Sequence, residues 1–503
     1  MRLKTNILAN LAGQGWSMLL QLILVPLYLH LLGIEAYGLV SIYVMLSATV
    51  QIFDLGFAQT LNRELARWNG SRDDPGELRD LVFTIEAVYY LLIALIVCVL
   101  LLALPFIWSD ALHARTVDKP TLLKAVGLMI AIIAMQWPVN LYQGGLMGLQ
   151  QQLKANGIRI ASSTFAGLGS LACLYFVSPT IVAFFSWQLL AAALTLATSA
   201  FLFRSQLPRT DRPSHFRVAI LKRIGRFSVG LSGLTISAIV LTQMDKWFLA
   251  TILPLELFGY FALAWTAANA LSLLTAPVFG AIYPRFSGLV VRAEREPLTA
   301  LYHTATQAIA ACIVPAALLM SFFSYDVLFA WTGNRAVAQH AAPILKVLSI
   351  GTMLNSFVHM PYAWELAHGR TRVFLLTNWF AIPLAFPALW YLSTRWGGLG
   401  AAFIWVALNL SYFVFAVPRV HREFAPRDRM QWLMHDIAAP LILAAGTMVV
   451  YRMMVPDAQT RAWMAVELAL GYVLGACAAL YASRALHPVL RQSIPASWRT
   501  MRR

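Results

Sequence analysis

The sequence predicts an all-α polytopic membrane protein with about 14 transmembrane helices, arranged as two parallel six-helix lobes plus two C-terminal helices. Hydrophobic residues make up 59% of the 503 residues and charged residues only 12%, whereas a soluble domain usually carries about 25% charged residues. The mean hydropathy is +0.67. Apolar runs of about 20 residues, enough to span a hydrocarbon core of roughly 30 Å, recur along the whole chain.

The apolar runs define the expected membrane spans in chain order. Their expected first residues are Ile7, Ala36, Leu81, Leu122, Gly157, Ile181, Phe227, Phe258, Ala300, Pro343, Val373, Gly397, His435 and Trp463. The first run follows a basic start but is longer than a signal peptide and has no small-residue cleavage site after it, so we expect it to be a retained span.

Lysine and arginine orient these spans. With the N-terminus in the cytoplasm, 29 of the 38 basic residues fall in inside-facing segments, as the positive-inside rule requires. Both termini are therefore expected to be cytoplasmic, and Lys154 and Arg159 are expected among the inside-facing charges. The net charge of +16 then reflects topology and meets anionic membrane lipids, so no nucleic acid partner is predicted.

A basic hydrophilic stretch near the middle of the chain divides it. The predicted parts are an N-terminal six-helix lobe at 1–203, a basic cytoplasmic linker at 204–226, a C-terminal six-helix lobe at 227–418, and two additional helices with a basic tail at 419–503. Residues 32–38 and 253–259 share Leu, an aliphatic residue, Glu, an aromatic residue and Gly in register. Two parallel repeats explain this echo; shared turn chemistry or chance explains it as well.

Polar groups of the first span lie on one side of the predicted helix. At about 100° per residue they occupy a stripe about 80° wide, formed by Asn6, Asn10, Gln14, Ser17, Gln21 and Tyr28. Unpaired amides are costly in hydrocarbon, so this stripe must face protein or a wet cavity. Interhelical hydrogen bonds account for two or three such groups, and six in a row favour a cavity.

The seventh span repeats this pattern and adds a charge pair. Its polar stripe contains Ser228, Ser232, Thr235, Thr242 and Lys246. Asp245 lies about 100° away from Lys246 on the helix. Since adjacent helix positions do not face each other, we expect the two charges not to form one salt bridge. Lys246 is either a cavity cation for an anionic substrate or a snorkelling or structurally paired lysine.

Two sets of candidate site residues follow. The predicted substrate-binding residues are Lys246, Asn10, Gln14, Gln21, Ser232, Thr235 and Thr242, and the predicted ion-coupling residues are Asp54, Asp245 and Glu365. Asp54 and Glu365 lie beside the turn elements FDLGF and MPYAWELAHG, where a carboxylate is able to carry a coupling proton or sodium ion. The alternative for these intramembrane acids is interfacial anchoring, helix capping or another structural contact.

Motifs of enzymes and metal proteins are absent from the sequence. It contains no G-x-x-x-x-G-K-[ST], no H-E-x-x-H and no C-x-x-C, and its four cysteines lie in apolar runs without metal-ligand spacing. The long outer loop that a glycan polymerase or glycosyltransferase usually carries is also missing. These observations favour a transporter over an enzyme, with no catalytic residues, no metal and no cofactor.

The opening stretch NILANLAGQGWSMLLQLILVPLYLHLLGIEAYGLVSIYVMLSATVQIFDLGFAQTLNRELAR resembles the polysaccharide transporter family, which includes bacterial O-antigen flippases. The matching features are the polar first span, L-G-x-E-x-Y-G, D-L-G-F and N-R-E-L-A-R. The family belongs to the superfamily of multidrug and toxin extruders and lipid II flippases. The first 70 residues carry the specific likeness, and the remainder matches in topology.

The resemblance implies two six-helix lobes that form a V in the bacterial inner membrane. It implies a flippase that moves undecaprenyl-diphosphate-linked oligosaccharide, an O-antigen or exopolysaccharide repeat unit, by alternating access coupled to a proton or sodium gradient. Polysaccharide polymerase and chain-length proteins are the implied protein partners. The alternatives are a multidrug-type cation-coupled antiporter on the same fold, a membrane-embedded glycan polymerase or glycosyltransferase, and a scaffold for the synthesis machinery.

Overall fold

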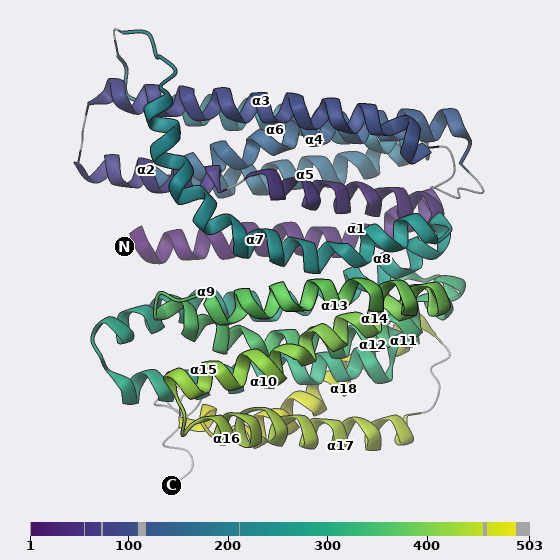
Figure 1. Ribbon diagram of the computed structural model, residues 1–503. Coiled ribbons are helices and arrows are strands. Elements are labelled where there is room, and N and C mark those ends of the chain that lie inside the picture. The colour runs from purple at the N-terminus through teal and green to yellow at the C-terminus, as the bar shows by residue number, and fades with distance from the viewer. Residues whose placement is uncertain are drawn as a thin grey trace, which may run out of the picture. The chain divides into compact units, whose positions relative to one another are not determined.

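The computed structural model describes residues 2–54, 56–71, 74–108, 117–210, 212–455 and 460–488, with side chains in these ranges except at 2–11, 69–71, 103–108, 223–232 and 234. Over these residues the chain is helical and has no strand (Figure 1). Contacts divide it into two compact units, residues 1–259 (unit 1) and 260–503 (unit 2). The domain boundaries expected from the sequence, at 203, 226 and 418, stay predictions.

Unit 1 begins with two long antiparallel helical passes and continues with helices that pack around α4. Its elements are α1 (Arg2–Val50), η1 (Gln51–Asp54), α2 (Phe57–Ser71), α3 (Pro75–Trp108), α4 (Lys119–Gly148), α5 (Gln152–Phe176), α6 (Ile181–Arg204), α7 (Val218–Ile252) and the start of α8 (Leu255–Asn269). Helix α4 packs on α2 and α6, and α1 packs on α5. The stacked rings of Tyr89 and Trp137, with centroids 4.2 Å apart, fill the space between α3 and α4.

Unit 2 is built around α10. Its elements are the rest of α8, α9 (Ser272–Val291), α10 (Arg295–Phe322), α11 (Ser324–Thr332), α12 (Arg335–Ala367), α13 (Arg372–Trp396), α14 (Gly398–Ser411), η2 (Tyr412–Ala416), α15 (Val417–Phe424), α16 (Arg429–Gln431), η3 (Trp432–Ala438), α17 (Ala439–Met454) and α18 (Arg461–Ala482). Helix α10 contacts α9, α12, α17 and α18, and 78% of the residues in its most apolar stretch are buried. Helix α10 is thus a central helix of unit 2.

The helices confirm the prediction of a multi-pass membrane protein. Twelve helical segments among the described residues are long and apolar enough to cross a membrane. One of them, Ala12–Asp54, covers the first two expected spans. Helices α7 and α8 are not among the twelve, but both lie where the sequence predicts a span.

The two similar segments, residues 32–38 and 253–259, contact each other within unit 1. Gly33, at φ 81°, breaks α1 into two passes, in a conformation that an L side chain rarely adopts. A β-carbon added to Gly38 would lie 2.6 Å from the carbonyl oxygen of Leu255, and one added to Gly259 would lie 2.6 Å from that of Ile34. Residues 34 and 38 correspond to residues 255 and 259 in the two similar segments. The glycine of each hairpin tip therefore leaves room for the backbone of the other tip.

The connection between α6 and α7 is held against α3 by a buried carboxylate. Asp80 is fully buried and forms salt bridges with Arg212 (3.1 Å) and Arg217 (2.7 Å). It also accepts the backbone N–H of His215 at 2.8 Å. Residues 212–217 of the predicted linker therefore pack against α3, and this contact fixes the place where α7 begins.

Prolines account for two wide turns in unit 2. Pro418 and Pro440 lack an N–H, so the usual bond to the carbonyl four residues earlier cannot form. In front of each proline the helix widens to a π-helix, η2 before Pro418 and η3 before Pro440. Such bulges often occur at functional sites, and both of these lie beside pockets described below.

Candidate functional site

A polar cavity of about 260 Å³ lies inside unit 1. Helices α4, α5 and α6 and the short η1 form its wall, with polar side chains from each of them. The lining residues are Gln51, Gln136, Val139, Asn140, Gln143, Arg159, Ser162, Ser163, Ala166, Gln188, Ala191, Ala192 and Thr195. A cavity this polar within a bundle of apolar helices is a candidate binding site.

Helical spacing explains why the polar groups converge. On α4 the three amides are at positions 136, 140 and 143, which lie on one face because residues three and four apart are neighbours. On α5 the residues at 159, 162 and 163 share a face for the same reason, and on α6 those at 188 and 195 are two turns apart. The small buried side chains of Ala191 and Ala192 leave the space open.

Hydrogen bonds hold two of the α4 amides in place. The hydroxyl of Tyr43 donates to Gln136 Oε1 at 2.6 Å. The amide nitrogen of Asn140 donates to Gln51 Oε1 at 3.0 Å. These contacts tie α4 to the second pass of α1 and to η1, so two walls of the cavity are preorganised by polar contacts between helices.

Arg159 brings a positive charge into this cavity. Its Nη2 donates to Gln143 Oε1 at 3.1 Å, and within the part of the chain that the structure describes no carboxylate pairs with it. A guanidinium carries five N–H donors, so donors remain for a ligand. A partly buried cation with a neutral partner favours a phosphate or carboxylate, which a guanidinium binds in bidentate fashion.

Arg159 was counted from the sequence among the inside-facing charges and was not predicted as a site residue. The structure begins α5 at Gln152, which puts Arg159 seven residues, roughly 10 Å, along the helix. The fifth span was expected to begin at Gly157, whereas Gln152 to Asn156 already form the first turns of the helix.

The predicted polar stripe of α1 divides into two parts. Ser17 donates to Ser163 Oγ at 3.2 Å or to the Gly13 carbonyl at 3.0 Å, and Tyr28 donates to the carbonyl of Gly167 at 2.7 Å. Two of the stripe residues therefore serve packing on α5. Gln14 and Gln21 are exposed, and the side chain of Asn10 lies outside the described residues.

The expectation about the charge pair of the seventh predicted span was wrong. Lys246 and Asp245 do form a salt bridge, with Nζ at 3.0 Å from Oδ1 and 3.2 Å from Oδ2. The same Nζ donates to the carbonyl of Thr242 at 2.7 Å. Helix geometry did not predict this contact because the long lysine side chain folds back along the helix, where its charge meets the carboxylate of the residue before it.

The other three predicted residues of α7 are placed only in part. Thr242 donates to the carbonyl of Ala238 at 2.8 Å, so its hydroxyl proton stays on its own helix. Thr235 is exposed. The side chain of Ser232 lies outside the described residues. The roles predicted for these residues stay predictions.

The two remaining candidate acids also accept hydrogen bonds from groups of the protein. Asp54 accepts a 2.5 Å hydrogen bond from the hydroxyl of Tyr89. Glu365 is fully buried and accepts the backbone N–H groups of Val373 (2.6 Å) and Phe374 (3.4 Å), in the first turn of α13. Glu365 thus has the geometry of a helix cap, and the ion-coupling role of both acids stays a prediction.

Sequence reasoning missed the amides of α4 and α6 and Arg159. The signal for α4 was present, because Gln136, Asn140 and Gln143 form a polar stripe like that of the first span. What the sequence does not show is that α4, α5 and α6 bring their polar faces together. Two such stripes on neighbouring helices are needed before either one can be recognised as a cavity wall.

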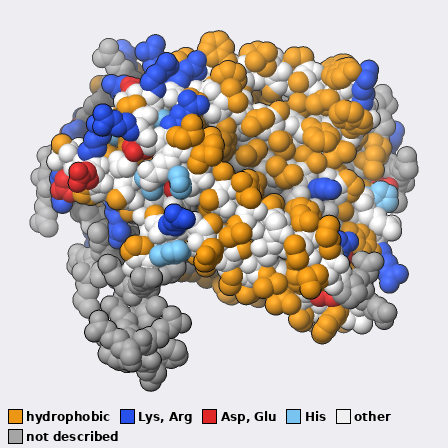
Figure 2. Space-filling view, turned by 90° about the horizontal axis from the view of Figure 1, so that it is seen from below, with side chains coloured by type: hydrophobic (Ala, Val, Ile, Leu, Met, Phe, Trp, Pro, Cys, Tyr) orange, Lys and Arg blue, Asp and Glu red, His pale blue; other side chains and the backbone are white. Residues whose placement is uncertain are grey.

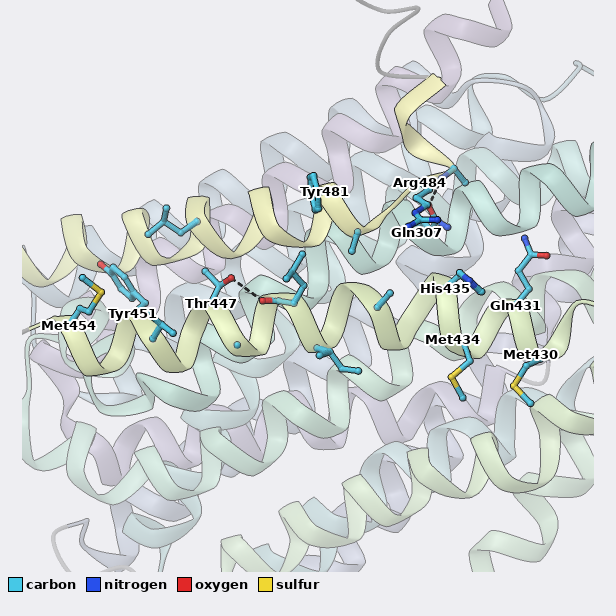
Figure 3. A pocket seen from close by; sticks show the side chains of 18 residues that line it. Gln307, Met430, Gln431, Met434, His435, Thr447, Tyr451, Met454, Tyr481 and Arg484 are labelled. Carbon is cyan, nitrogen blue, oxygen red and sulfur yellow. Dashed lines mark hydrogen bonds between the residues drawn. The ribbon is translucent and has the colours of Figure 1, made fainter.

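Unit 2 contains a larger groove of about 1090 Å³ between α17 and α18, beside α10. Along most of its length the groove is apolar, with Ile442, Leu443 and Leu474 among its lining residues. Figure 3 shows Gln307 and Arg484 together at one end, and Tyr451 and Met454 toward the other. A long apolar groove with a polar end has the layout of a site for an amphipathic molecule.

A buried polar cluster lies behind this groove. Asp436, which is fully buried, bonds to His303 Nδ1 through one oxygen and accepts from Gln307 Nε2 at 2.7 Å through the other. Gln307 in turn accepts the backbone N–H of Ala485 at 2.7 Å. The cluster joins α10, η3 and the end of α18, so it fixes the groove walls relative to one another.

Comparison with known proteins places the chain in a family. The sequence model of the polysaccharide biosynthesis protein family matches residues 3–290, which is more than half of the chain. The chain belongs to this family. It is also 22% identical over 383 residues to a Shigella flexneri protein named "Putative O-antigen transporter", covering 74% of this chain and 87% of that one.

Solved structures show the same fold. Lipid II flippase MurJ, in an inward closed conformation, matches with a TM-score of 0.67 and 11% identity over 97% of this chain and 99% of that chain. An inward-facing multidrug resistance MATE family transporter of the MOP superfamily matches with a TM-score of 0.66 and 17% identity, over 84% and 95%. The predicted fold class and family resemblance are therefore confirmed, and these relatives are named as transporters, not enzymes.

Proposed function

We propose that this family member is a secondary transporter that flips undecaprenyl-diphosphate-linked oligosaccharide, an O-antigen or exopolysaccharide repeat unit, across the bacterial inner membrane. The observation that carries the proposal is Arg159, a cation without a carboxylate partner among the described residues, in a cavity lined by amides and hydroxyls. The name of the Shigella flexneri relative supports the same class of substrate.

The chemistry of the substrate fits the chemistry of the cavity. A diphosphate needs a cation and N–H donors, which Arg159 supplies in a planar fork. Sugar hydroxyls both donate and accept hydrogen bonds, as do the side chains of Gln136, Asn140 and Ser162 at the wall. An amphipathic substrate also matches the long apolar groove of unit 2 with its polar end.

The transport cycle that we propose is alternating access, driven by a proton or sodium gradient. Solved MATE transporters with this fold are described in inward-facing and outward-facing conformations, which supports a fold with two access states. Asp54, Asp245 and Glu365 stay the proposed ion-coupling residues. Both termini are proposed to be cytoplasmic, and polymerase and chain-length proteins are the proposed partners.

The fold does not distinguish a multidrug antiporter from the proposed flippase, because MurJ and the MATE transporter match almost equally well. The cavity of unit 1 favours the glycan lipid. A cationic drug is attracted by carboxylates, and the residues that line this cavity include Arg159 but no Asp or Glu. The same lack of carboxylates argues against a glycosyltransferase centre at this place, where general acid or base chemistry usually needs one.

Replacing Arg159 with glutamine is expected to reduce flipping of the lipid-linked oligosaccharide by ten- to a hundredfold. A hydrogen bond to a charged group contributes about 1.5–3 kcal/mol, and about 1.4 kcal/mol corresponds to a factor of ten. Arg159→Lys keeps the charge but loses the bidentate fork, so an intermediate rate is expected. The measurement is the transfer of the lipid-linked glycan in proteoliposomes containing equal amounts of protein.

Lys154→Gln is the matched control. It removes one positive charge from the same helix, and Lys154 does not line the cavity. Transport that survives Arg159→Gln but is lost in Lys154→Gln would contradict the proposed site. Transport of a cationic drug in place of the glycan lipid, by the unchanged protein, would support the multidrug alternative.

The role of Lys246 has a separate test. Because its ammonium is already neutralised by Asp245, we expect Lys246→Ala to lower transport by severalfold, less than Arg159→Gln does. Lys246→Arg is expected to retain most activity. Full transport by the alanine variant, at equal membrane abundance, would remove the substrate role predicted for this residue.

A further inference from the structure

A second polar pocket, of about 430 Å³, lies in unit 2 at the turn between α15 and α16. Three arginines, Arg419, Arg422 and Arg429, line it together with His421 and Phe415. It is separate from the cavity of unit 1, and neither the family match nor the proposed transport assigns it a role.

Local structure brings the three arginines together. Arg419 and Arg422 are three residues apart on α15, so they share a face. The chain then turns, and Arg429, the first residue of α16, lines the same pocket. The π-helix η2 ahead of Pro418 precedes this face and sets its orientation.

The pocket has a rigid, buried floor. His421 is only 1% exposed, its Nδ1 contacts the carbonyl of Val417 at 2.9 Å, and its Nε2 lies 3.1 Å from the hydroxyl of Tyr302. Its ring packs against Trp432, with centroids 5.2 Å apart. The arginines therefore project from a fixed surface rather than from a mobile loop.

The positive charge of this pocket is not neutralised by the protein. Among the described residues none of the three arginines pairs with a carboxylate. Glu423, the acid next to Arg422, forms its ion pair with Arg370, and Asp428 makes no ion pair with any of the three. Three guanidinium groups and one nearby carboxylate leave a local charge of about +2.

The surroundings of the pocket are those of a membrane interface. Val414 and Phe415, on η2, line the pocket and are 56% and 54% exposed. They belong to a segment apolar enough to span a membrane, Gly398–Phe424. Arg419 and Arg422 lie near its end, and Arg429 begins the next such segment, Arg429–Met454. On the face shown in Figure 2, hydrophobic side chains cover the middle and Lys and Arg gather toward the ends. A ligand at this place meets charge on one side and hydrocarbon on the other.

We propose that this pocket binds the headgroup of an anionic phospholipid that carries two phosphates. Basic pockets between membrane helices bind such headgroups, and planar guanidinium groups match phosphate oxygens. Two phosphodiester groups carry a charge of about −2, which balances the local charge of the pocket. The exposed Val414 and Phe415 then contact the acyl chains of the bound lipid.

The test uses the full-length protein and measures lipid binding alone. Binding of cardiolipin, which has two phosphates, and of phosphatidylglycerol, which has one, is measured by native mass spectrometry. The unchanged protein is expected to bind cardiolipin at least tenfold more tightly than phosphatidylglycerol. The triple variant Arg419→Gln, Arg422→Gln, Arg429→Gln is expected to lose this preference, and the corresponding lysine triple variant to keep part of it.

A matched control separates the pocket from general charge. Arg292→Gln, Arg295→Gln and Arg372→Gln remove three exposed arginines that do not line the pocket, and this variant is expected to keep the cardiolipin preference. An equal loss in both triple variants overturns the proposal. So does an unchanged preference in the pocket variant, or displacement of cardiolipin by an equimolar polyprenyl diphosphate, which would assign the pocket to the transport substrate.

A free anion is distinguished by inorganic pyrophosphate. If pyrophosphate displaces cardiolipin at equal concentration, the pocket recognises the phosphates without the lipid, and the assignment to a membrane lipid is wrong. None of these outcomes depends on transport, so the proposal stands or falls separately from the flippase function. A size-exclusion profile like that of the unchanged protein shows that each variant is folded.

Discussion

Replacing Asp436 with alanine is expected to lower the free energy of unfolding by about 3–5 kcal/mol, because it leaves buried polar groups without their partner. Asp436 is fully buried, contacts His303 and accepts from Gln307 at 2.7 Å. Both partners have little access to water, since His303 and Gln307 are only 5% and 4% exposed. Thermal denaturation of the detergent-solubilised protein measures the change as a fall in the melting temperature.

Two variants sharpen this experiment. Asp436→Asn keeps the shape and an acceptor for Gln307, so it should cost less than the alanine variant. Glu294→Ala is the control in the same unit, because Glu294 is 44% exposed and lies 4.0 Å from Arg292; an exposed pair of this kind contributes about 0–1 kcal/mol. If Asp436→Ala is as stable as Glu294→Ala, the cluster does not hold the groove walls together.

Alanine at Gly38 or Gly259 is expected to destabilise the protein by about 1–3 kcal/mol, the usual cost of overpacking. Each added methyl would lie 2.6 Å from a backbone carbonyl oxygen, that of Leu255 or that of Ile34. A backbone carbonyl cannot rotate away as a flexible side chain does, so the two hairpin tips must separate. Thermal denaturation again provides the readout.

The double variant gives the more specific result. Gly38 and Gly259 face the same contact, so once one substitution has opened it the second is expected to cost less than it does alone. Gly15→Ala, on α1, is the control, because a β-carbon there meets nothing within 4 Å. It should be neutral or slightly stabilising, since alanine favours helix over glycine. Strictly additive losses for the two glycines would contradict a shared contact.

The fold could be predicted from the sequence because its main signals are local. Each apolar run identifies its own helix, and the positions of Lys and Arg order the runs. The echo of residues 32–38 and 253–259 pointed to related hairpin tips, and the structure places the two tips against each other. Motifs within the first 70 residues sufficed to identify the family, whose model matches residues 3–290.

The candidate site could not be predicted in the same way. Its walls come from three helices and η1, and no local pattern shows which polar faces meet. Arg159 was missed because it was counted among the inside-facing charges, and the sequence does not show that its side of α5 faces α4 and α6. The Lys246–Asp245 contact was missed because backbone periodicity fixes where a side chain leaves the helix, but not how a long side chain folds back.

The reciprocal glycine contact has a consequence for the origin of the chain. Ile34 meets Gly259 as Leu255 meets Gly38, which is the rule of an isologous interface, where one patch recognises a copy of itself. A polypeptide of half this length would be able to form the contact by pairing with a second copy, with the same glycine of each subunit meeting the backbone of the other. Gene duplication and fusion would then have preserved a homodimer interface inside a single chain.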